Sequence, residues 1–276
     1  MKQQHVTARV IRYPRIRRWT AAAYRSVRKK PLIHGLMEVD VTIARAWLRE
    51  HKARTGESLS FTAFLTTCLA KAVDEHKAVQ AIRQGRSRLV IFDDVDVWLP
   101  IERDAGGHME PLPHIIRAAN RKSFRAIHDE IRAAQVASVE PVLRGLRILP
   151  AALYGPYMWL FWRIGRLTPR YLKRSVGTVS LTAVGMFGKG AGWGVPPPCP
   201  TPLMVTVGGV GEKPVIVDGQ ITSREYLSLT ISVDHEIVDG APAARFSRRL
   251  RELIESGYGL EGGATAPTPQ TARAAR

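Results

Sequence analysis

The segment Tyr226–Ser256 constrains the fold more than any other part of the sequence. It joins an apolar run, Tyr226–Val233, to a second apolar pattern over Ala241–Ser256 through a short polar step. The run has the length and composition of a buried strand, and the second pattern has the period of an amphipathic helix. Asp239 stands where the N-cap of that helix is expected. A buried strand that leads directly into a helix is typical of a fold in which helices cover a sheet.

The rest of the sequence alternates between helix and strand patterns in the same way. Further helices are predicted over 15–30, Ile43–Thr55 with Thr42 as its cap, Phe61–His76 with Ser60 as its cap, and 123–137. Further strands are predicted over Leu36–Val41, two runs within Leu89–Ile101, Val176–Val184, Leu203–Val207 and Val215–Val217. This order predicts one α/β domain built around a mixed sheet that is flanked by helices.

Cysteine usage and hydropathy exclude several classes of protein. The 276-residue chain has only Cys68 and Cys199, which form no CxxC pair. A disulfide framework, a cysteine zinc finger and an iron–sulfur cluster are therefore excluded, and no metal site is predicted. The first thirty residues lack the apolar core of a signal peptide. The longest uncharged run, Ile148–Trp162, is interrupted by two prolines and is too short to span a bilayer. We therefore expect a cytoplasmic protein, with peripheral membrane contact as an alternative.

The net charge of +17 is concentrated in two segments. Residues 1–30 contain ten basic side chains and no acidic one, and residues 141–174 contain seven basic side chains and no acidic one. Elsewhere the basic and acidic residues balance. The pattern indicates a neutral globular body that carries two basic segments.

A His-x-x-x-Asp-Gly pattern follows the predicted buried strand, with His235, Asp239 and Gly240 at its three defined positions. A histidine at a strand end can act as a general base, because a neutral imidazole accepts a proton near neutral pH. Two simpler interpretations remain open at this point. His235 could be a hydrogen-bonded structural residue, and the Asp-Gly pair could be only a turn and helix cap.

Residues 226–256 resemble the C-terminal segment of the acyltransferase component of 2-oxoacid dehydrogenase complexes. That family carries Asp-His-x-x-x-Asp-Gly followed by a helix containing Ala-Ala-Arg-Phe, and both are found here. The resemblance extends over about 15–137 and 175–257, and includes GTVSLTAVGMFG, IIRAANRKS and EVDVT. Chloramphenicol acetyltransferase shares the family's fold and its His-x-x-x-Asp-Gly motif. The resemblance therefore implies a chloramphenicol acetyltransferase-like fold.

The resemblance also implies a chemistry and assigns roles to three residues. His235 matches the family's general base, and Thr182 matches a Ser or Thr whose hydroxyl stabilises the oxyanion. Asp239 matches an aspartate that holds the histidine loop through an ionic contact. The implied activity moves an acyl group between coenzyme A and a thiol such as dihydrolipoamide, with acyl-CoA as substrate and without a covalent cofactor. The implied assembly is a trimer, or a multiple of one, in which His235 and Thr182 face each other from different chains. Without the resemblance, Thr182 would be an ordinary strand residue.

The sequence departs from the family pattern at four points. Glu236 replaces the usual arginine after the histidine, and Pro31-Leu32-Ile33 replaces a frequent Pro-His-Phe. No lipoyl or subunit-binding domain is recognisable, so a lipoyl carrier protein is expected to act in trans. Residues 138–174 form an insertion. These departures leave two alternatives open: a CoA-dependent O- or N-acyltransferase acting on a small molecule, and a non-catalytic assembly or membrane-associated scaffold.

The expected organisation has four parts. A basic arm and helix span 1–30, the acyltransferase domain spans 15–258, the insertion spans 138–174 within it, and a disordered tail spans 259–276. The insertion combines basic residues with the aromatic side chains of Tyr154, Tyr157, Trp159, Phe161 and Trp162. It fits a helical hairpin packed on the body or between subunits, an anionic membrane surface, or a partner protein. The arm fits packing on a neighbouring subunit, the phosphates of CoA, or nonspecific nucleic acid; no motif for specific nucleic acid recognition is present.

Overall fold

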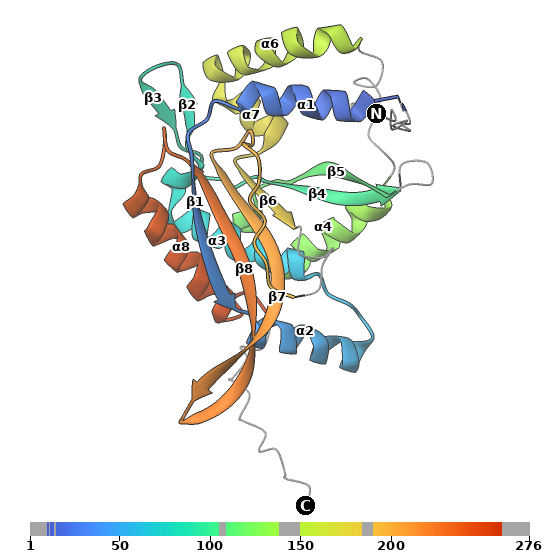
Figure 1. Cartoon of the computed structure of the whole chain (residues 1–276), viewed down its shortest axis with the longest axis vertical. Coiled ribbons are helices and arrows are strands. Elements are labelled where there is room, and N and C mark those ends of the chain that lie inside the picture. The colour runs from blue at the N-terminus through green and yellow to red at the C-terminus, as the bar shows by residue number, and fades with distance from the viewer. Residues whose placement is uncertain are drawn as a thin grey trace, which may run out of the picture.

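The computed structural model describes residues 10, 12–13, 15–104, 109–137, 150–183 and 190–260. Within them a mixed six-stranded sheet has the order β1-β8-β7-β6-β4-β5, and β2 and β3 form a separate hairpin (Figure 1). The strands are β1 Leu32–Asp40, β2 Ile82–Gln84, β3 Arg88–Val90, β4 Val97–Asp104, β5 Met109–Ile116, β6 Val179–Ala183, β7 Leu203–Val217 and β8 Gln220–Asp234. The α-helices are α1 Arg15–Val27, α2 Thr42–Thr55, α3 Phe61–Glu75, α4 Phe124–Val136, α6 Tyr154–Leu167, α7 Pro169–Val176 and α8 Gly240–Glu255. The predicted α/β fold with a mixed sheet is confirmed.

The two faces of the sheet differ in chemistry. Alternate residues of β8, at positions 227, 229, 231 and 233, are buried in the apolar core that the sheet shares with α2, α3, α4 and α8. The intervening side chains Ser228, Thr230 and Ser232 are equally buried on the opposite face. Gly192 N donates a hydrogen bond to Ser228 Oγ, and His34 Nδ1 lies 2.8 Å from Ser232 Oγ. The polar face is therefore covered by other segments of the protein rather than open to solvent.

The predicted helix signals are largely correct. Ser60 and Ser123 each accept a hydrogen bond from the backbone N–H three residues later, so they cap α3 and α4 as expected. Gly56 ends α2 in the left-handed conformation, with φ +77°. The predicted cap at Thr42 is wrong, because Thr42 is the first helical residue and its Oγ instead accepts a hydrogen bond from Glu225 N. The first helix ends at Val27, three residues before the predicted position.

The strands are longer than the sequence patterns predict. The segments predicted at 203–207 and 215–217 are parts of one strand, β7, which contains a register shift between Val207 and Val210. The two-residue turn Asp218-Gly219 joins β7 to β8, and both residues have the positive φ that such hairpin turns require. Strand β5 is absent from the prediction. Its prolines 111 and 113 are tolerated because β5 lies at the edge of the sheet.

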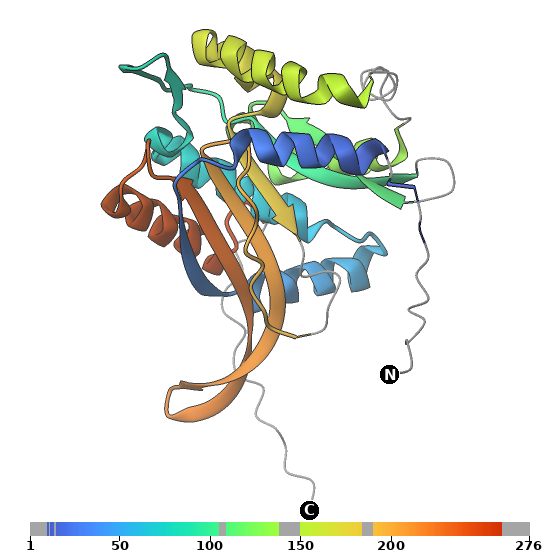
Figure 2. The same cartoon turned by 45° about the horizontal axis from the view of Figure 1, so that its top comes forward.

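The described part of the insertion is helical and packs on the body. Helix α6 lies along α1 at the end of the molecule opposite the β7–β8 turn, in both Figure 1 and Figure 2. The contact is made by Ala22 of α1 with Tyr154 and Met158 of α6, and Trp162 Nε1 donates to Ser26 Oγ at 2.8 Å. Gly165 allows α7 to pack closely against α6, since a Cβ at this position would overlap the Leu172 side chain. Of the three interpretations of the insertion, packing on the body is confirmed for residues 150–174.

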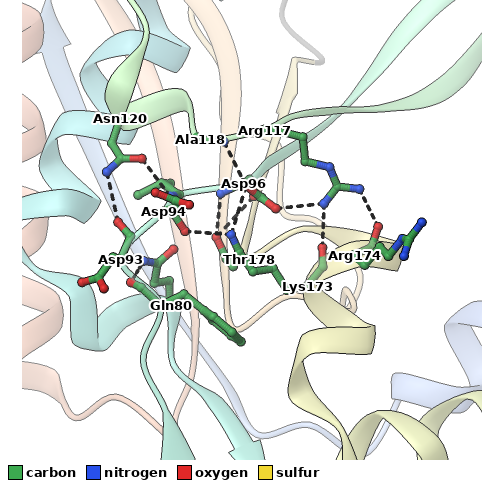
Figure 3. A network of polar contacts seen from close by, with 12 residues as sticks. Gln80, Asp93, Asp94, Asp96, Arg117, Ala118, Asn120, Lys173, Arg174 and Thr178 are labelled. Atoms are coloured by element: carbon green, nitrogen blue, oxygen red, sulfur yellow. Dashed lines mark hydrogen bonds and ion pairs between the residues drawn. The ribbon is translucent and has the colours of Figure 1, made fainter.

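Asp96 anchors helix α7 to the sheet (Figure 3). Its buried carboxylate pairs with Arg117 at 2.8 Å and with Lys173 at 3.2 Å, and accepts a hydrogen bond from Ala118 N. Arg117 also donates to the carbonyl oxygens of Lys173 and Arg174, near the C-terminal end of α7. This network holds α7 beside the start of β4. Within the described residues, no helix is long and apolar enough to cross a bilayer.

Candidate active site

His235 immediately follows β8, where the strand leaves the sheet. Its backbone N–H donates to the carbonyl oxygen of Pro31 at 2.8 Å, which fixes the start of the loop. Its imidazole is 46% exposed, and its Nδ1 lies 3.5 Å from a carboxylate oxygen of Asp239. An imidazole that is held at one nitrogen and open on its other side can accept a proton from a bound substrate. A fully satisfied core histidine would be buried, so this geometry favours the functional interpretation.

The residue before His235 is held by a lysine from the basic N-terminal segment. Lys30 Nζ lies 3.3 Å from Asp234 Oδ2, and it also donates to the carbonyl oxygen of Pro200 at 2.9 Å. The Asp234 side chain is only 5% exposed, and its Oδ1 accepts a hydrogen bond from Glu236 N at 3.1 Å. The Lys30–Asp234 pair thus fixes the residue before His235, and the hydrogen bond from Glu236 N to Asp234 fixes the residue after it. Neither residue of the pair is among the site residues predicted from the sequence, although an aspartate at the end of a buried strand indicates a charge that needs a partner.

The placement of Asp239 differs from the expectation. Asp239 occupies the N-cap position of α8, yet its side chain makes no capping hydrogen bond and is 86% exposed. Within the described residues, its ion-pair partner is His235 itself. In a single chain, the buried carboxylate that holds the histidine loop is therefore Asp234 rather than Asp239. The weak pairing still favours one orientation of the His235 ring.

Thr182 lies on β6 in a row of three threonines that crosses the sheet. It is level with Thr206 on β7, which is level with Thr230 on β8. Thr206 and Thr230 are fully buried, and neither Oγ1 has a hydrogen-bond partner within the described residues. Thr182 is half-buried at the end of this row. Its hydroxyl therefore belongs to the polar face of the sheet rather than to the apolar core.

Thr182 and His235 are far apart within one chain. In the register of the sheet, Thr182 on β6 is aligned with Thr230 on β8, which is two strands away. His235 lies five residues after Thr230 in the direction of β8. At about 3.3 Å per residue and about 4.8 Å between strands, this separation is about 19 Å. An imidazole and a hydroxyl at that distance cannot act on one carbonyl group. One chain therefore contains both groups but does not bring them together.

A cavity of about 950 Å³ opens beside the histidine loop, between α1, α6, α7 and β2. Asp234 and Glu236, the two neighbours of His235, line it together with the indole rings of Trp159 and Trp162. Its walls also carry the basic side chains of Arg25, Lys29, Lys30, Arg83, Arg86, Arg163 and Arg166. Cations outnumber the two carboxylates, and Glu236 is already paired with Arg83 at 2.7 Å. The cavity is suited to an anionic ligand that carries a flat ring.

Neither cysteine is suited to form a covalent acyl intermediate. Cys68 and Cys199 are both buried, and burial raises the pKa of each thiol above its ordinary value. A protonated, buried thiol is a poor nucleophile. Neither cysteine is therefore a candidate nucleophile.

A sequence model described as 2-oxoacid dehydrogenases acyltransferase (catalytic domain) matches residues 6–140 and 162–260. The chain belongs to this family. The matched ranges include His235, Asp239 and Thr182, and the unmatched residues 141–161 fall within the predicted insertion. The family membership predicted from the motifs is confirmed.

A family relative from Pseudomonas putida is the lipoamide acyltransferase component of the branched-chain alpha-keto acid dehydrogenase complex. It is 26% identical over 224 residues, which are 79% of this chain and 45% of that protein. The chain thus spans about half the length of the curated family member that it matches.

Two solved structures show the same fold. A probable dihydrolipoamide acetyltransferase from Listeria monocytogenes superposes with a TM-score of 0.67 at 21% identity, covering 94% of this chain and 98% of that one. A chloramphenicol acetyltransferase superposes with a TM-score of 0.50 at 14% identity, covering 88% and 96%. The predicted chloramphenicol acetyltransferase-like fold is confirmed for this family member.

Proposed function

We propose that this protein is an acyltransferase that moves an acyl group between coenzyme A and a thiol acceptor of the dihydrolipoamide type. The observation that carries the proposal is the placement of His235: half-exposed at a strand end, beside Asp239, and fixed by Pro31 and by the Lys30–Asp234 pair. Family membership supplies the reaction class. The small-molecule O- or N-acyltransferase and the non-catalytic scaffold remain the alternatives that the experiment below separates.

In the proposed reaction, His235 removes the proton from the acceptor thiol, and the thiolate attacks the thioester carbonyl of acyl-CoA. The tetrahedral intermediate carries a negative oxygen, which the Thr182 hydroxyl stabilises by donating a hydrogen bond. Collapse of the intermediate breaks the bond to the CoA sulfur. The CoA thiolate then takes the proton held by His235, which returns the imidazole to its neutral form. The reaction exchanges one thioester for another and needs no redox partner.

The proposed site is completed by a second copy of the chain. The separation of about 19 Å between Thr182 and His235 supports this arrangement, because both groups must contact one carbonyl. In a closed trimer, the sheet edge that carries Thr182 in one chain would lie against the loop that carries His235 in the next chain, which forms three equivalent sites. A lipoyl carrier acting in trans would reach the same site from solvent.

The cationic cavity is the proposed site for the phosphate-bearing end of CoA. Its basic side chains, on Arg86 and Arg163 among others, would pair with phosphate oxygens, and the rings of Trp159 and Trp162 would contact the adenine. Since Asp234 and Glu236 line the cavity, a ligand in it adjoins the histidine loop. This interpretation accounts for the charge of α1 and the insertion through a substrate rather than through nucleic acid.

The test is incubation of the full chain with a panel of acyl-CoA thioesters and free dihydrolipoamide, with chromatographic measurement of free CoA and acyl-dihydrolipoamide. Formation of both products in equal amounts supports the proposal. Acyl transfer to a panel of amines or alcohols, with none to dihydrolipoamide, would indicate the small-molecule alternative. Absence of turnover with every donor and acceptor would support a scaffold.

A further inference from the structure

Helix α6 carries a second apolar stripe, most of which lies outside its contact with α1. The stripe consists of Tyr157, Leu160, Ile164 and Leu167, preceded by Leu153 at the N-cap, at spacings of four and three residues that place them along one face. Their exposed fractions are between 39% and 66%. At the border of the stripe, the Tyr157 ring also contacts Trp19 of α1, at 5.3 Å between ring centroids. The opposite side of α6 is already buried against α1. An ordinary surface helix exposes a polar face, whereas α6 is apolar on both sides.

The stripe lies on the outermost layer of the molecule. In both Figure 1 and Figure 2, α1 lies between α6 and the sheet, and α6 forms the end of the molecule opposite the β7–β8 turn. The stripe is therefore open to a large, flat partner. Trp159, which is 65% exposed, lies beside the stripe, and the Arg163 guanidinium lies 5.7 Å from its ring.

The charges around the stripe have one sign. The sequence contains no acidic residue from 1 to 37 or from 141 to 211, and these ranges include the whole of α1, α6 and α7. The charged residues of α6 are Arg163 and Arg166, and the helix has no acidic residue. A second α6 would therefore bring cationic side chains together with no acidic partner. Charge complementarity argues against a second copy and favours an anionic partner.

We infer that the outer face of α6 is a docking surface for an anionic lipid membrane, on which the helix lies parallel to the bilayer plane. An interfacial helix combines an apolar face with aromatic and basic residues at its border, as α6 does. The α6 apolar stripe would insert among the acyl chains, and the arginines would remain at the headgroups. The helix needs no spanning length for this mode of binding.

The experiment is co-sedimentation of the full chain with phosphatidylcholine vesicles, with and without phosphatidylglycerol, at low and high salt. We expect binding to the anionic vesicles at low salt, weaker binding at high salt, and little binding to pure phosphatidylcholine. The double variant Leu160→Asp/Ile164→Asp should reduce the partition coefficient by about tenfold or more, because it places charges within the apolar face. Both positions are exposed and neither lines the cavity, so acyl transfer and the melting temperature should not change.

The matched control is Ile216→Asp/Ile221→Asp, which changes an exposed isoleucine pair on the β7–β8 hairpin. This control should bind vesicles like the wild type. Equal loss of binding in both double variants, equal binding to neutral and anionic vesicles, or no vesicle binding by the wild type would each overturn the inference. A change in oligomer mass caused by Leu160→Asp/Ile164→Asp would also overturn it, in favour of a second copy. None of these readouts depends on the proposed acyltransferase activity.

Discussion

Lys30 and Asp234 form an ion pair of 3.3 Å that ties the end of the basic N-terminal segment to the residue immediately before His235. The two residues are 204 positions apart in the sequence, and the aspartate is almost completely buried. Lys30 also donates to the carbonyl oxygen of Pro200, so one ammonium group joins three segments at the site. The pair explains how a histidine on an exposed loop can be held in a defined position.

Replacement of Lys30 should therefore affect stability and activity together. In Lys30→Met the buried Asp234 carboxylate loses its cation, which we expect to lower the free energy of unfolding by about 3–5 kcal/mol. Chemical denaturation and the rate of acyl transfer measure the two effects. Lys52→Met is the matched control, since it removes the same charge from an exposed residue of α2 that does not line the cavity. Equal effects of the two substitutions would mean that only the net charge matters.

Replacement of His235 should abolish catalysis and preserve the fold. His235→Ala removes the proposed base, whose loss is expected to lower kcat by about 10²–10⁴-fold. Because the side chain is 46% exposed, little packing is lost and the melting temperature should stay near that of the wild type. Activity within a few-fold of the wild type would exclude His235 as the base.

Replacement of Thr182 should act on kcat rather than on substrate binding. The oxyanion exists only in the transition state, so Thr182→Ala is expected to lower kcat by about 10²-fold with little change in the KM for acyl-CoA. Thr182→Ser keeps the hydroxyl and should restore most of the rate. A raised KM at constant kcat would show instead that Thr182 contacts the bound substrate.

Mixing two inactive variants tests whether the site lies between chains. Chains with His235→Ala keep Thr182, and chains with Thr182→Ala keep His235. Random co-assembly should therefore restore about one quarter of the sites if each site takes one group from each of two neighbouring chains. The activity of co-expressed chains, compared with each variant alone, provides the measurement. No recovery in mixed oligomers would place both groups in the same chain's site.

The stability of the protein should fall in acid partly because of Glu75. Hydrogen bonding to Arg249 of α8 is the main cause that lowers the pKa of Glu75 from 4.5 to about 2. The stabilisation is therefore complete above about pH 4.5 and is lost as the pH falls towards 2. Since the pair is partly exposed, we expect a loss of about 1 kcal/mol. Glu75→Gln should flatten the pH dependence of unfolding in this range, and an unchanged pH dependence would contradict the assignment.

The local features of the fold could be predicted from the sequence by itself. Ser60, Ser123 and Gly56 mark helix ends because their effects depend on backbone groups within four residues. The buried strand predicted at 226–233 is confirmed for 227–233, and its alternation Leu-Ser-Leu-Thr-Ile-Ser-Val corresponds to an apolar and a polar face of β8, both of them buried. The His-x-x-x-Asp-Gly pattern located His235 because the motif is contiguous and joins a strand to a helix.

Only the tertiary structure decided how distant residues meet. Lys30 finds Asp234 because β1 pairs with β8, which brings the end of the N-terminal segment to the end of the last strand. Thr182 and His235 are separated because strand register, which no local pattern reveals, places them at different levels of the sheet. The sequence predicted a surface helical element rich in aromatic and basic residues, but only its packing on α1 showed which side of α6 is covered. The sequence by itself determined which residues have side chains suited to catalysis. The pairing of strands and helices determined which of these residues come into contact, because residues hundreds of positions apart are brought together only by the folded backbone.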